Sequence, residues 1–190
     1  PAFTIPDDCP APSVVTIHDL VYLLFPKTVS LTRRQYYRFT INRSIRQADR
    51  ILADSKSTAD DLRHHLDVPP QRIVTAPLGV SARFFRESES FRLDRARRRY
   101  GLPERYILTV GTQEPRKNLP TLLRAYADLL RARPDAPPLV IAGRVGWKVG
   151  HIGRLIRNLK LTDRVRFPGF VSDEDLPLVY GMADAFVCIS

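Results

Sequence analysis

Cysteine is scarce in this sequence, and its scarcity excludes two classes of protein. Only Cys9 and Cys188 are present, and they lie far apart without a CxxC or His/Cys ligand spacing. The sequence therefore predicts neither a disulfide framework nor a zinc site, and a reducing cytoplasm fits this cysteine usage. No apolar run approaches the roughly 18 residues that a membrane-spanning helix needs. RNP motifs, KH loops and zinc-finger spacings are also absent, so a nucleic-acid-binding role has no recognisable module behind it.

The residues that are present describe a basic globular protein. Hydrophobic residues make up 44% of the 190-residue chain and charged residues 26%, which fits one large domain or two small ones. The net charge of +10 suits nucleic acid, an anionic membrane or a phosphate-bearing substrate. Charge alone does not separate these three classes of partner.

Predicted strands and helices alternate along the chain. We expect strands at 14–17, 50–53, 72–79, 106–111, 137–143, 165–167 and 185–189, and helices at 31–50, 57–66, 119–131, 151–160 and 173–180. This order predicts an α/β protein with parallel sheets covered by helices on both faces. The charged segment 87–103 predicts a partly helical link between a domain over 1–86 and a domain over 104–190. Because the chain ends in the apolar run 185–190, we expect it to be a piece of a longer protein.

Two of the predicted helices carry a further signal. The helix over 31–50 has an apolar face at helical spacing and an arginine-rich surface, formed by Arg33, Arg34, Arg38, Arg43, Arg46 and Arg50. Such a surface is typical of a solvated face, and contact with an anionic membrane is the alternative. In the next helix, Ser57 followed by Asp60 predicts a capping box at the N-terminus.

Ligands of open α/β sheets bind beyond the carboxyl ends of the strands, and three such ends carry notable residues. The stretch GTQEPRKN places Arg116 and Lys117 between a predicted strand and a predicted helix, with Asn118 as the expected N-cap. A helix N-terminus beside two cations attracts phosphate, and the alternative is a pair of solvated surface cations. His18, at another strand end, could exchange protons near neutral pH or be structural. The third end, AGRVGWKVG at 142–150, lacks the Walker and GxGxxG spacings, so a flexible loop at the rim of a cleft is the preferred interpretation.

Several stretches together resemble one enzyme family, although each alone is weak. They are HDLVYLLFP, ADRILADSKSTADDL, RIVTAPLGV, YILTVGTQEPRKNLPTLLRAY, LVIAG and VRFPGFVSDEDLPLVYGMADAFV, and they cover most of residues 14–190. Taken in this order, they are similar to the nucleotide-sugar glycosyltransferases of family 4. That family has the GT-B fold, with two Rossmann-like domains. The mannosyltransferase-like branch that builds surface polysaccharides is the most similar.

The resemblance implies a set of site residues. The donor's diphosphate would be held by Arg116 and Lys117, and the base would contact the backbone near Phe170 and Val171. The full implied donor set is Gly111, Thr112, Glu114, Arg116, Lys117, Asn118, Gly143, Phe170 and Val171. Some relatives have an arginine where this chain has Thr112. The implied catalytic residues are His18 and Asp19, beside the sugar and the acceptor.

The resemblance also implies an activity. We expect a retaining transfer of a hexosyl group from a nucleotide-sugar to a saccharide or lipid-linked acceptor, without a metal ion or another cofactor. The family's glycine-rich N-terminal loop and its later pair of glutamates have no counterpart in this chain, so we expect the piece alone to be poorly active. The alternatives are a non-catalytic module that binds nucleotide-sugars and a nucleic-acid binder. The expected location is the cytoplasm, with the helix over 31–50 able to contact the inner face of the membrane.

Overall fold

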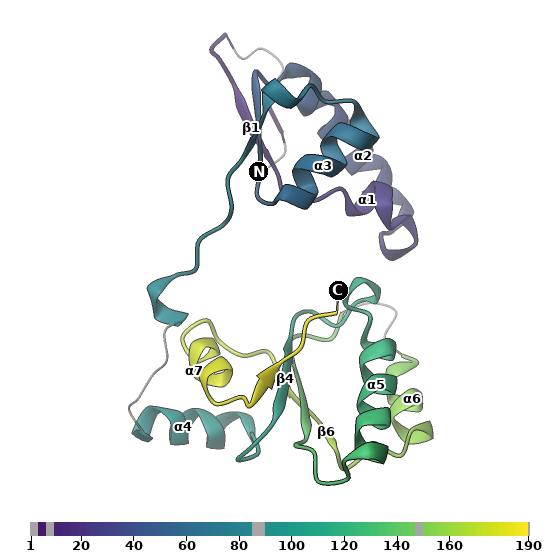
Figure 1. The fold of residues 1–190 in the computed structure, drawn as a ribbon, viewed down its shortest axis with the longest axis vertical. Helices are drawn as coiled ribbons and strands as arrows, with labels where there is room; N and C mark the ends of the chain where they lie inside the picture. The colour runs from purple at the N-terminus through teal and green to yellow at the C-terminus, as the bar shows by residue number, and fades with distance from the viewer. Residues whose placement is uncertain (1–3, 7–9, 85–89, 147–149, 190) are drawn as a thin grey trace. The chain divides into compact units, whose positions relative to one another are not determined.

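The computed structural model describes residues 4–6, 10–84, 90–146 and 150–189. The chain divides into two compact units, residues 1–80 and residues 81–190, and each unit has a sheet of its own (Figure 1). Every strand pairing within the two sheets is parallel. The alternation of strands and helices therefore gives the predicted α/β class.

The first unit is a three-stranded sheet with helices packed on it. Its strands are β1 (Val14–Ile17), β2 (Arg50–Ala53) and β3 (Ile73–Thr75), in the order β1-β2-β3. The helices are α1 (Val21–Leu24), α2 (Leu31–Gln47) and α3 (Lys56–Leu66), with 3-10 turns η1 (Pro26–Thr28) and η2 (Pro70–Arg72). Figure 1 draws α1, α2 and α3 on the same side of this sheet. The buried side chains of β1 and β2 join those of α2 and α3 in one core.

Two details of the first unit differ from the sequence prediction. Helix α2 ends at Gln47, because Arg50 already pairs in β2 and the residue after the helix is extended. The predicted capping box at Ser57 is wrong. Ser55 is the N-cap of α3, and its hydroxyl accepts a hydrogen bond from the backbone N–H of Thr58 at 3.0 Å. The extended backbone of Ser55 points its hydroxyl at the first turn, whereas Ser57 already lies inside the helix.

The second unit is a four-stranded sheet between two pairs of helices. Its strands are β4 (Ile107–Val110), β5 (Leu139–Ala142), β6 (Val165–Gly169) and β7 (Ala185–Phe186), in the order β6-β5-β4-β7. The helices are α4 (Ser90–Tyr100), α5 (Leu119–Ala132), α6 (Ile152–Asn158) and α7 (Leu176–Gly181), with 3-10 turns η3 (Ala82–Phe84) and η4 (Pro115–Lys117). Figure 1 shows α5 and α6 on one side of this sheet and α4 and α7 on the other.

Strand β5 explains this three-layer arrangement. All four of its residues are buried. Leu139 and Ile141 belong to the core with α5 and α6, whereas Val140 and Ala142 belong to the core with α7. Successive side chains of a strand point to opposite faces, so a strand that is apolar throughout needs cover on both sides.

The segment predicted as a link contributes a helix to the second unit. Helix α4 packs on α7, and its Ala96 is almost fully buried. The division between the units falls at residues 80 and 81, ahead of the predicted link over 87–103. Directly before β4, Tyr106 is fully buried and its hydroxyl donates to the carbonyl oxygen of Val179 at 2.6 Å. Burial raises the pKa of Tyr106 to about 12, so this hydroxyl stays protonated as a donor.

Candidate functional site

The carboxyl ends of β4, β5 and β6 meet at one edge of the second sheet. Gly111, Gly143 and Gly169 follow or end these strands and continue the ladder beyond them. The N–H of Gly111 donates to Ala142 at 2.9 Å, and the N–H of Gly143 donates to Gly169 at 2.8 Å. All three glycines have a positive φ. This edge therefore carries backbone without Cβ atoms at the end of each strand, where ligands of such sheets bind.

The backbone of 143–146 lies directly against that of 111–113. A Cβ atom on Gly143 would stand 2.0 Å from the carbonyl oxygen of Gly111, and one on Gly146 would stand 2.3 Å from that of Gln113. The N–H of Gln113 donates to Arg144, and the N–H of Gly146 donates to Gln113. The sequence predicted a flexible loop at 142–150. Residues 143–146 instead extend the pairing of β4 with β5, and Lys148 lies outside the described residues.

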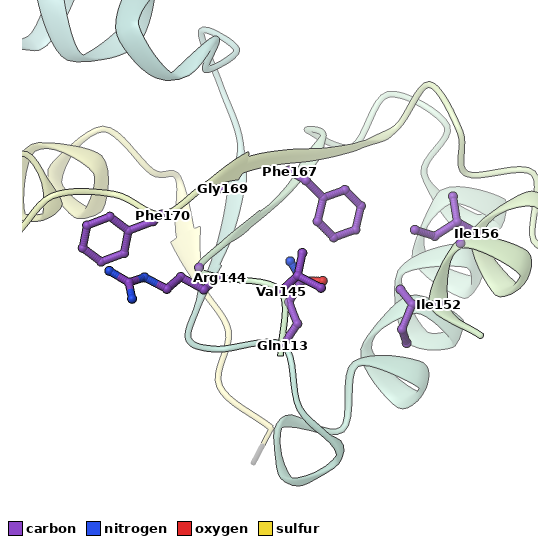
Figure 2. Close-up of a pocket in the computed structure, with 10 residues that line it drawn as sticks. Gln113, Arg144, Val145, Ile152, Ile156, Phe167, Gly169 and Phe170 are labelled. Carbon is purple, nitrogen blue, oxygen red and sulfur yellow. The ribbon is translucent and has the colours of Figure 1, made fainter. Parts of the chain in front are cut away.

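A pocket of about 520 Å³ opens at this edge of the sheet. Figure 2 shows Phe167, Ile152 and Ile156 around one side of it, and Arg144 beside Phe170 on the other. The guanidinium of Arg144 lies 4.5 Å from the centroid of the Phe170 ring, a cation–π contact. The lining is mainly apolar, and Gln113 adds a nearly buried amide. A flat apolar group with a polar edge fits such walls. The lining residues are Gln113, Gly143, Arg144, Val145, Ile152, Gly153, Ile156, Phe167, Gly169 and Phe170.

The two predicted cations stand beside the end of β4. Lys117 lies over Gly111, since its Cε would be only 3.0 Å from a Cβ atom at that glycine. Arg116 pairs with Glu114, whose carboxylate oxygen is 2.8 Å from Nη2 and 3.2 Å from Nε. Glu114 holds the guanidinium of Arg116, and its predicted contact with a donor stays a prediction. An anion bound here would meet Lys117 at the glycine edge and would share Arg116 with Glu114.

Asn118 occupies the predicted N-cap position of α5, but its side chain acts differently from the prediction. The residue is in the left-handed region, with φ 49°, and its side chain makes no hydrogen bond to a backbone N–H. Its side-chain oxygen accepts from the hydroxyl of Thr121 at 2.9 Å instead. The side chain of Asn118 therefore caps no backbone N–H of α5, and the first turn is closed by the backbone carbonyl oxygen of Asn118, which accepts from the N–H groups of Thr121 and Leu122. The partial positive charge of the helix end still favours an anion nearby.

The predicted base-contacting residues divide into one exposed and one buried side chain. Phe170 is 55% exposed, whereas Val171 is 5% exposed and belongs to the core with α7. The side chain of Val171 is therefore unavailable to a ligand, and contact with a base through the backbone here stays a prediction. Thr112 stands near Gly146, where its methyl group would lie 3.0 Å from a Cβ atom.

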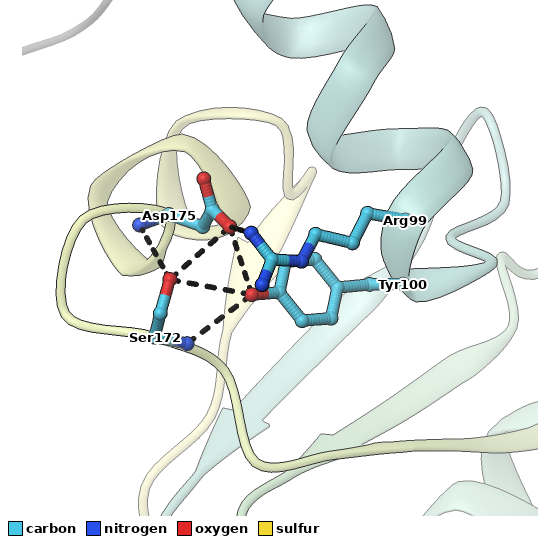
Figure 3. A network of polar contacts seen from close by, with 4 residues as sticks. All are labelled: Arg99, Tyr100, Ser172 and Asp175. Atoms are coloured by element: carbon cyan, nitrogen blue, oxygen red, sulfur yellow. Dashed lines mark hydrogen bonds and ion pairs between the residues drawn. The ribbon is translucent and has the colours of Figure 1, made fainter.

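A polar network that the sequence did not predict anchors this turn (Figure 3). The hydroxyl of Tyr100 donates to Asp175 at 2.8 Å and accepts from the backbone N–H of Ser172 at 3.2 Å. Asp175 is 5% exposed as a residue and also pairs with Arg99 at 3.0 Å. Because Ser172 follows Val171, the network fixes the backbone beside Phe170. Tyr100 lies more than 70 positions from Ser172 and Asp175, so no local motif reveals these contacts.

Replacing Tyr100 with phenylalanine tests whether this network positions the turn. Loss of the hydroxyl removes the acceptor of the Ser172 backbone N–H and one of the hydrogen bonds of Asp175, which keeps Arg99 and the Ser172 hydroxyl as partners. The free energy of unfolding should fall by about 1–3 kcal/mol. We expect the Kd for a nucleoside diphosphate to rise by about threefold to tenfold, which is about 1 kcal/mol. Urea unfolding and calorimetric titration measure the two effects.

The matched control is Tyr126→Phe. Tyr126 is also buried in the second unit, and its hydroxyl donates to Pro137, which precedes β5 at the opposite edge of the sheet. This variant should lose comparable stability and keep its affinity. Equal losses of affinity in both variants would reduce the Tyr100 network to a merely stabilising role.

In the first unit, His18 follows β1 and is held by a carboxylate. Its Nδ1 is 3.0 Å from Asp54 Oδ2, and its backbone oxygen accepts from the hydroxyl of Thr58 at 2.9 Å. The side chain of His18 is 42% exposed, so a ligand can reach it. Asp54 was missed from the sequence, although it follows β2, the parallel neighbour of β1. Asp19 accepts from the N–H of Val21, the first residue of α1, at 3.1 Å, a structural contact beside the predicted catalytic role.

These features together define a class of protein. The two α/β units each have a parallel sheet with polar residues at the carboxyl ends of its strands. The second unit also combines two cations with a mainly apolar pocket. Residues 91–190 match the family described as Glycosyl transferases group 1, and residues 6–84 match Glycosyltransferase Family 4. The chain therefore belongs to the family 4-like glycosyltransferases.

Individual relatives agree with this assignment. O-antigen chain mannosyltransferase B of Escherichia coli is 30% identical over 175 residues, which are 92% of this chain and 46% of that protein. D-inositol 3-phosphate glycosyltransferase of Salinispora tropica is 35% identical over 152 residues, which are 74% of this chain and 32% of that protein. The chain thus spans less than half the length of these relatives.

A solved structure supports the fold. The Anabaena protein HepE in complex with UDP-glucose is 20% identical, with a TM-score of 0.72 over 94% of this chain and 47% of that one. The fold is GT-B, as predicted, with a parallel sheet of three strands in the first unit and of four in the second.

Proposed function

We propose that this chain supplies the sugar-donor site and part of the acceptor side of a hexosyltransferase. The enzyme moves a hexosyl group from a nucleotide-sugar to a saccharide or lipid-linked acceptor in the synthesis of a surface polysaccharide or glycan. The carrying observation is the convergence of Lys117, Arg116 and the apolar pocket on the glycine edge of the second sheet. A nucleotide-sugar or nucleoside diphosphate has the matching parts, an anionic diphosphate joined through ribose to a flat aromatic base.

The cations would stabilise the leaving group of the reaction. When the bond between sugar and phosphate breaks, negative charge grows on the nucleoside diphosphate. Lys117 offers a point charge, and Arg116 offers a planar fork that can contact two oxygens. Interactions that strengthen as charge develops lower the barrier more than they tighten substrate binding. This neutralisation by side chains is the basis for our proposal that the reaction needs no metal ion.

The base would occupy the pocket beside Phe170. Arg144 and Phe170 form one wall, and the backbone of Val171 offers hydrogen-bonding groups at a position that Tyr100 and Asp175 hold in place. HepE was solved with UDP-glucose, which supports a nucleotide-sugar as the donor. Backbone contacts discriminate between bases without leaving a side-chain signature, so both UDP and GDP are to be tested.

His18 would act on the acceptor side, next to the transferred sugar. Asp54 binds Nδ1 and fixes the ring, so Nε2 is the nitrogen that would meet a substrate. A hydrogen bond donated by Nε2 would stabilise the negative charge that develops in the transition state as the bond between sugar and phosphate breaks. Retention of configuration at the sugar is the outcome that the family resemblance implies.

Replacing His18 with alanine in the full-length protein that contains this chain tests the proposal. We expect kcat for glycosyl transfer to fall by about a hundredfold, since one preorganised donor in an active site contributes that much. Binding of nucleoside diphosphate should stay unchanged, because Arg116 and Lys117 belong to the other unit. The control is His65→Ala, an exposed histidine on α3. Transfer that survives in His18→Ala, with binding also unchanged, would remove His18 from the mechanism.

A further inference from the structure

The surface of α2 that faces away from the core combines cations with exposed apolar side chains. From Leu20 to Ala48 the chain contains no aspartate or glutamate. The same segment has six cations, which are Lys27, Arg33, Arg34, Arg38, Arg43 and Arg46. Surface helices normally mix charges of both signs, which limits self-repulsion. A helix surface with a single sign of charge points to an anionic partner.

Large apolar residues lie among these arginines instead of in the core. Leu31 is 75% exposed, Phe39 is 64% exposed and Tyr36 is 58% exposed. Ile41 and Ile45 already fill the core-facing side of the helix. A purely solvated face would not need three large apolar side chains, so their exposure argues against that interpretation.

A groove of about 320 Å³ lies on this surface. It is lined by Gln35, Arg38, Phe39, Asn42 and Arg46, and no lining residue is acidic. The side-chain oxygen of Asn42 accepts from the hydroxyl of Tyr22 at 3.2 Å, which leaves its NH₂ group as a donor. Two guanidinium groups and amide donors beside an aromatic ring suit a phosphate group attached to an apolar body.

We propose that the outer face of α2, formed by Leu31, Gln35, Tyr36, Arg38, Phe39, Asn42 and Arg46, docks on an anionic phospholipid bilayer. Leu31, Tyr36 and Phe39 enter the interface, and lipid phosphates lie between Arg38 and Arg46. Aromatic residues and arginine stems are favoured where one end of a side chain is apolar and the other is charged. Among the described residues, no helix is long and apolar enough to cross the bilayer.

Charge complementarity selects the bilayer over other partners. A covering protein segment would have to bring several carboxylates to pair these arginines, since unpaired charges are costly to bury. Nucleic acid would pair with the charges, and its bases could stack on Tyr36 and Phe39, but it would not bury the aliphatic side chain of Leu31. An anionic bilayer satisfies both the charges and the apolar side chains. This surface lies outside the donor and acceptor sites, so the inference does not depend on the proposed transfer reaction.

Vesicle co-sedimentation tests the proposal with the complete chain. The wild type should bind vesicles of phosphatidylcholine with phosphatidylglycerol and should bind pure phosphatidylcholine far more weakly. In Arg38→Gln/Arg46→Gln the affinity for the anionic vesicles should fall by about thirtyfold, since each arginine near such a surface contributes about fivefold. Phe39→Ser should also weaken binding, and its loss should persist at high salt because the contribution is apolar.

The matched control changes the same number of arginines elsewhere. Arg95→Gln/Arg98→Gln removes two exposed cations from α4 and should lower the affinity by no more than about twofold, the scale of a distant screened charge. Circular dichroism confirms that each variant is folded. Equal losses in both double variants would mean that net charge alone drives binding and would overturn the proposal. Tighter binding to single-stranded DNA than to anionic vesicles would overturn it in favour of a nucleic-acid surface.

Discussion

Replacing Gly143 with alanine should lower the free energy of unfolding by about 2–5 kcal/mol and abolish measurable binding of nucleoside diphosphate. The added Cβ atom would stand 2.0 Å from the carbonyl oxygen of Gly111 and 2.6 Å from its carbon. Backbone atoms cannot rotate away, so β4 and β5 must separate at their carboxyl ends. The φ of +138° adds strain, because residues with a side chain rarely adopt it.

Gly150→Ala is the control for this substitution. Gly150 lies shortly after Gly143, and a Cβ atom there meets nothing within 4 Å. Urea unfolding and titration with nucleoside diphosphate on both variants separate a general effect of alanine from the clash. A Gly143→Ala variant as stable as the wild type would show that the two strand ends are not in contact in solution.

Removing either cation at the end of β4 should weaken nucleoside diphosphate binding by about tenfold to a hundredfold. Each of Arg116→Ala and Lys117→Ala deletes a charge-assisted hydrogen bond to phosphate, which contributes about 1.5–3 kcal/mol. Stability should change little, because neither residue is buried. The measurement is calorimetric titration with UDP and GDP at constant ionic strength.

Arg124→Ala serves as the charge-matched control for both variants. Arg124 is exposed on α5, the helix that begins beside the two cations. Loss of one positive charge there should leave the affinity within about twofold of the wild type, as expected for a screened surface charge. If all three variants lose affinity alike, binding depends on the total charge of the unit and not on a site at β4.

The architecture was predictable because it depends on local periodicity. The run LVIA in β5 is apolar throughout, and only a strand covered on both faces buries every residue of such a run. Helix α5 places Leu122, Leu123 and Tyr126 in the core, and these residues lie at the spacing of one helix face. The predicted start of α3 failed because two serines stand two positions apart and only backbone geometry decides which one caps the helix.

The candidate site was only partly predictable, for a physical reason. The carboxyl ends of the predicted strands indicate which segments would approach a ligand. The sequence analysis could therefore name Gly111, Lys117 and Gly143 as candidate site residues. The contacts between those segments depend on the register of β4 with β5, which no single segment encodes. The Tyr100–Asp175 hydrogen bond and the His18–Asp54 pair are of this kind, since each joins elements that only the fold brings together.

Nuclear magnetic resonance of the ¹⁵N-labelled chain, titrated with UDP and with GDP, locates the proposed donor site directly. At 21.7 kDa the chain is small enough for amide signals to be followed one by one. Binding at the glycine edge predicts saturable shifts for residues 111–118, 143–146 and 169–172 with at least one of the two nucleotides. The amides of the first unit should stay unchanged. Shifts that are absent with both nucleotides, or that concentrate on α2, would contradict a nucleotide-sugar site at the ends of β4, β5 and β6.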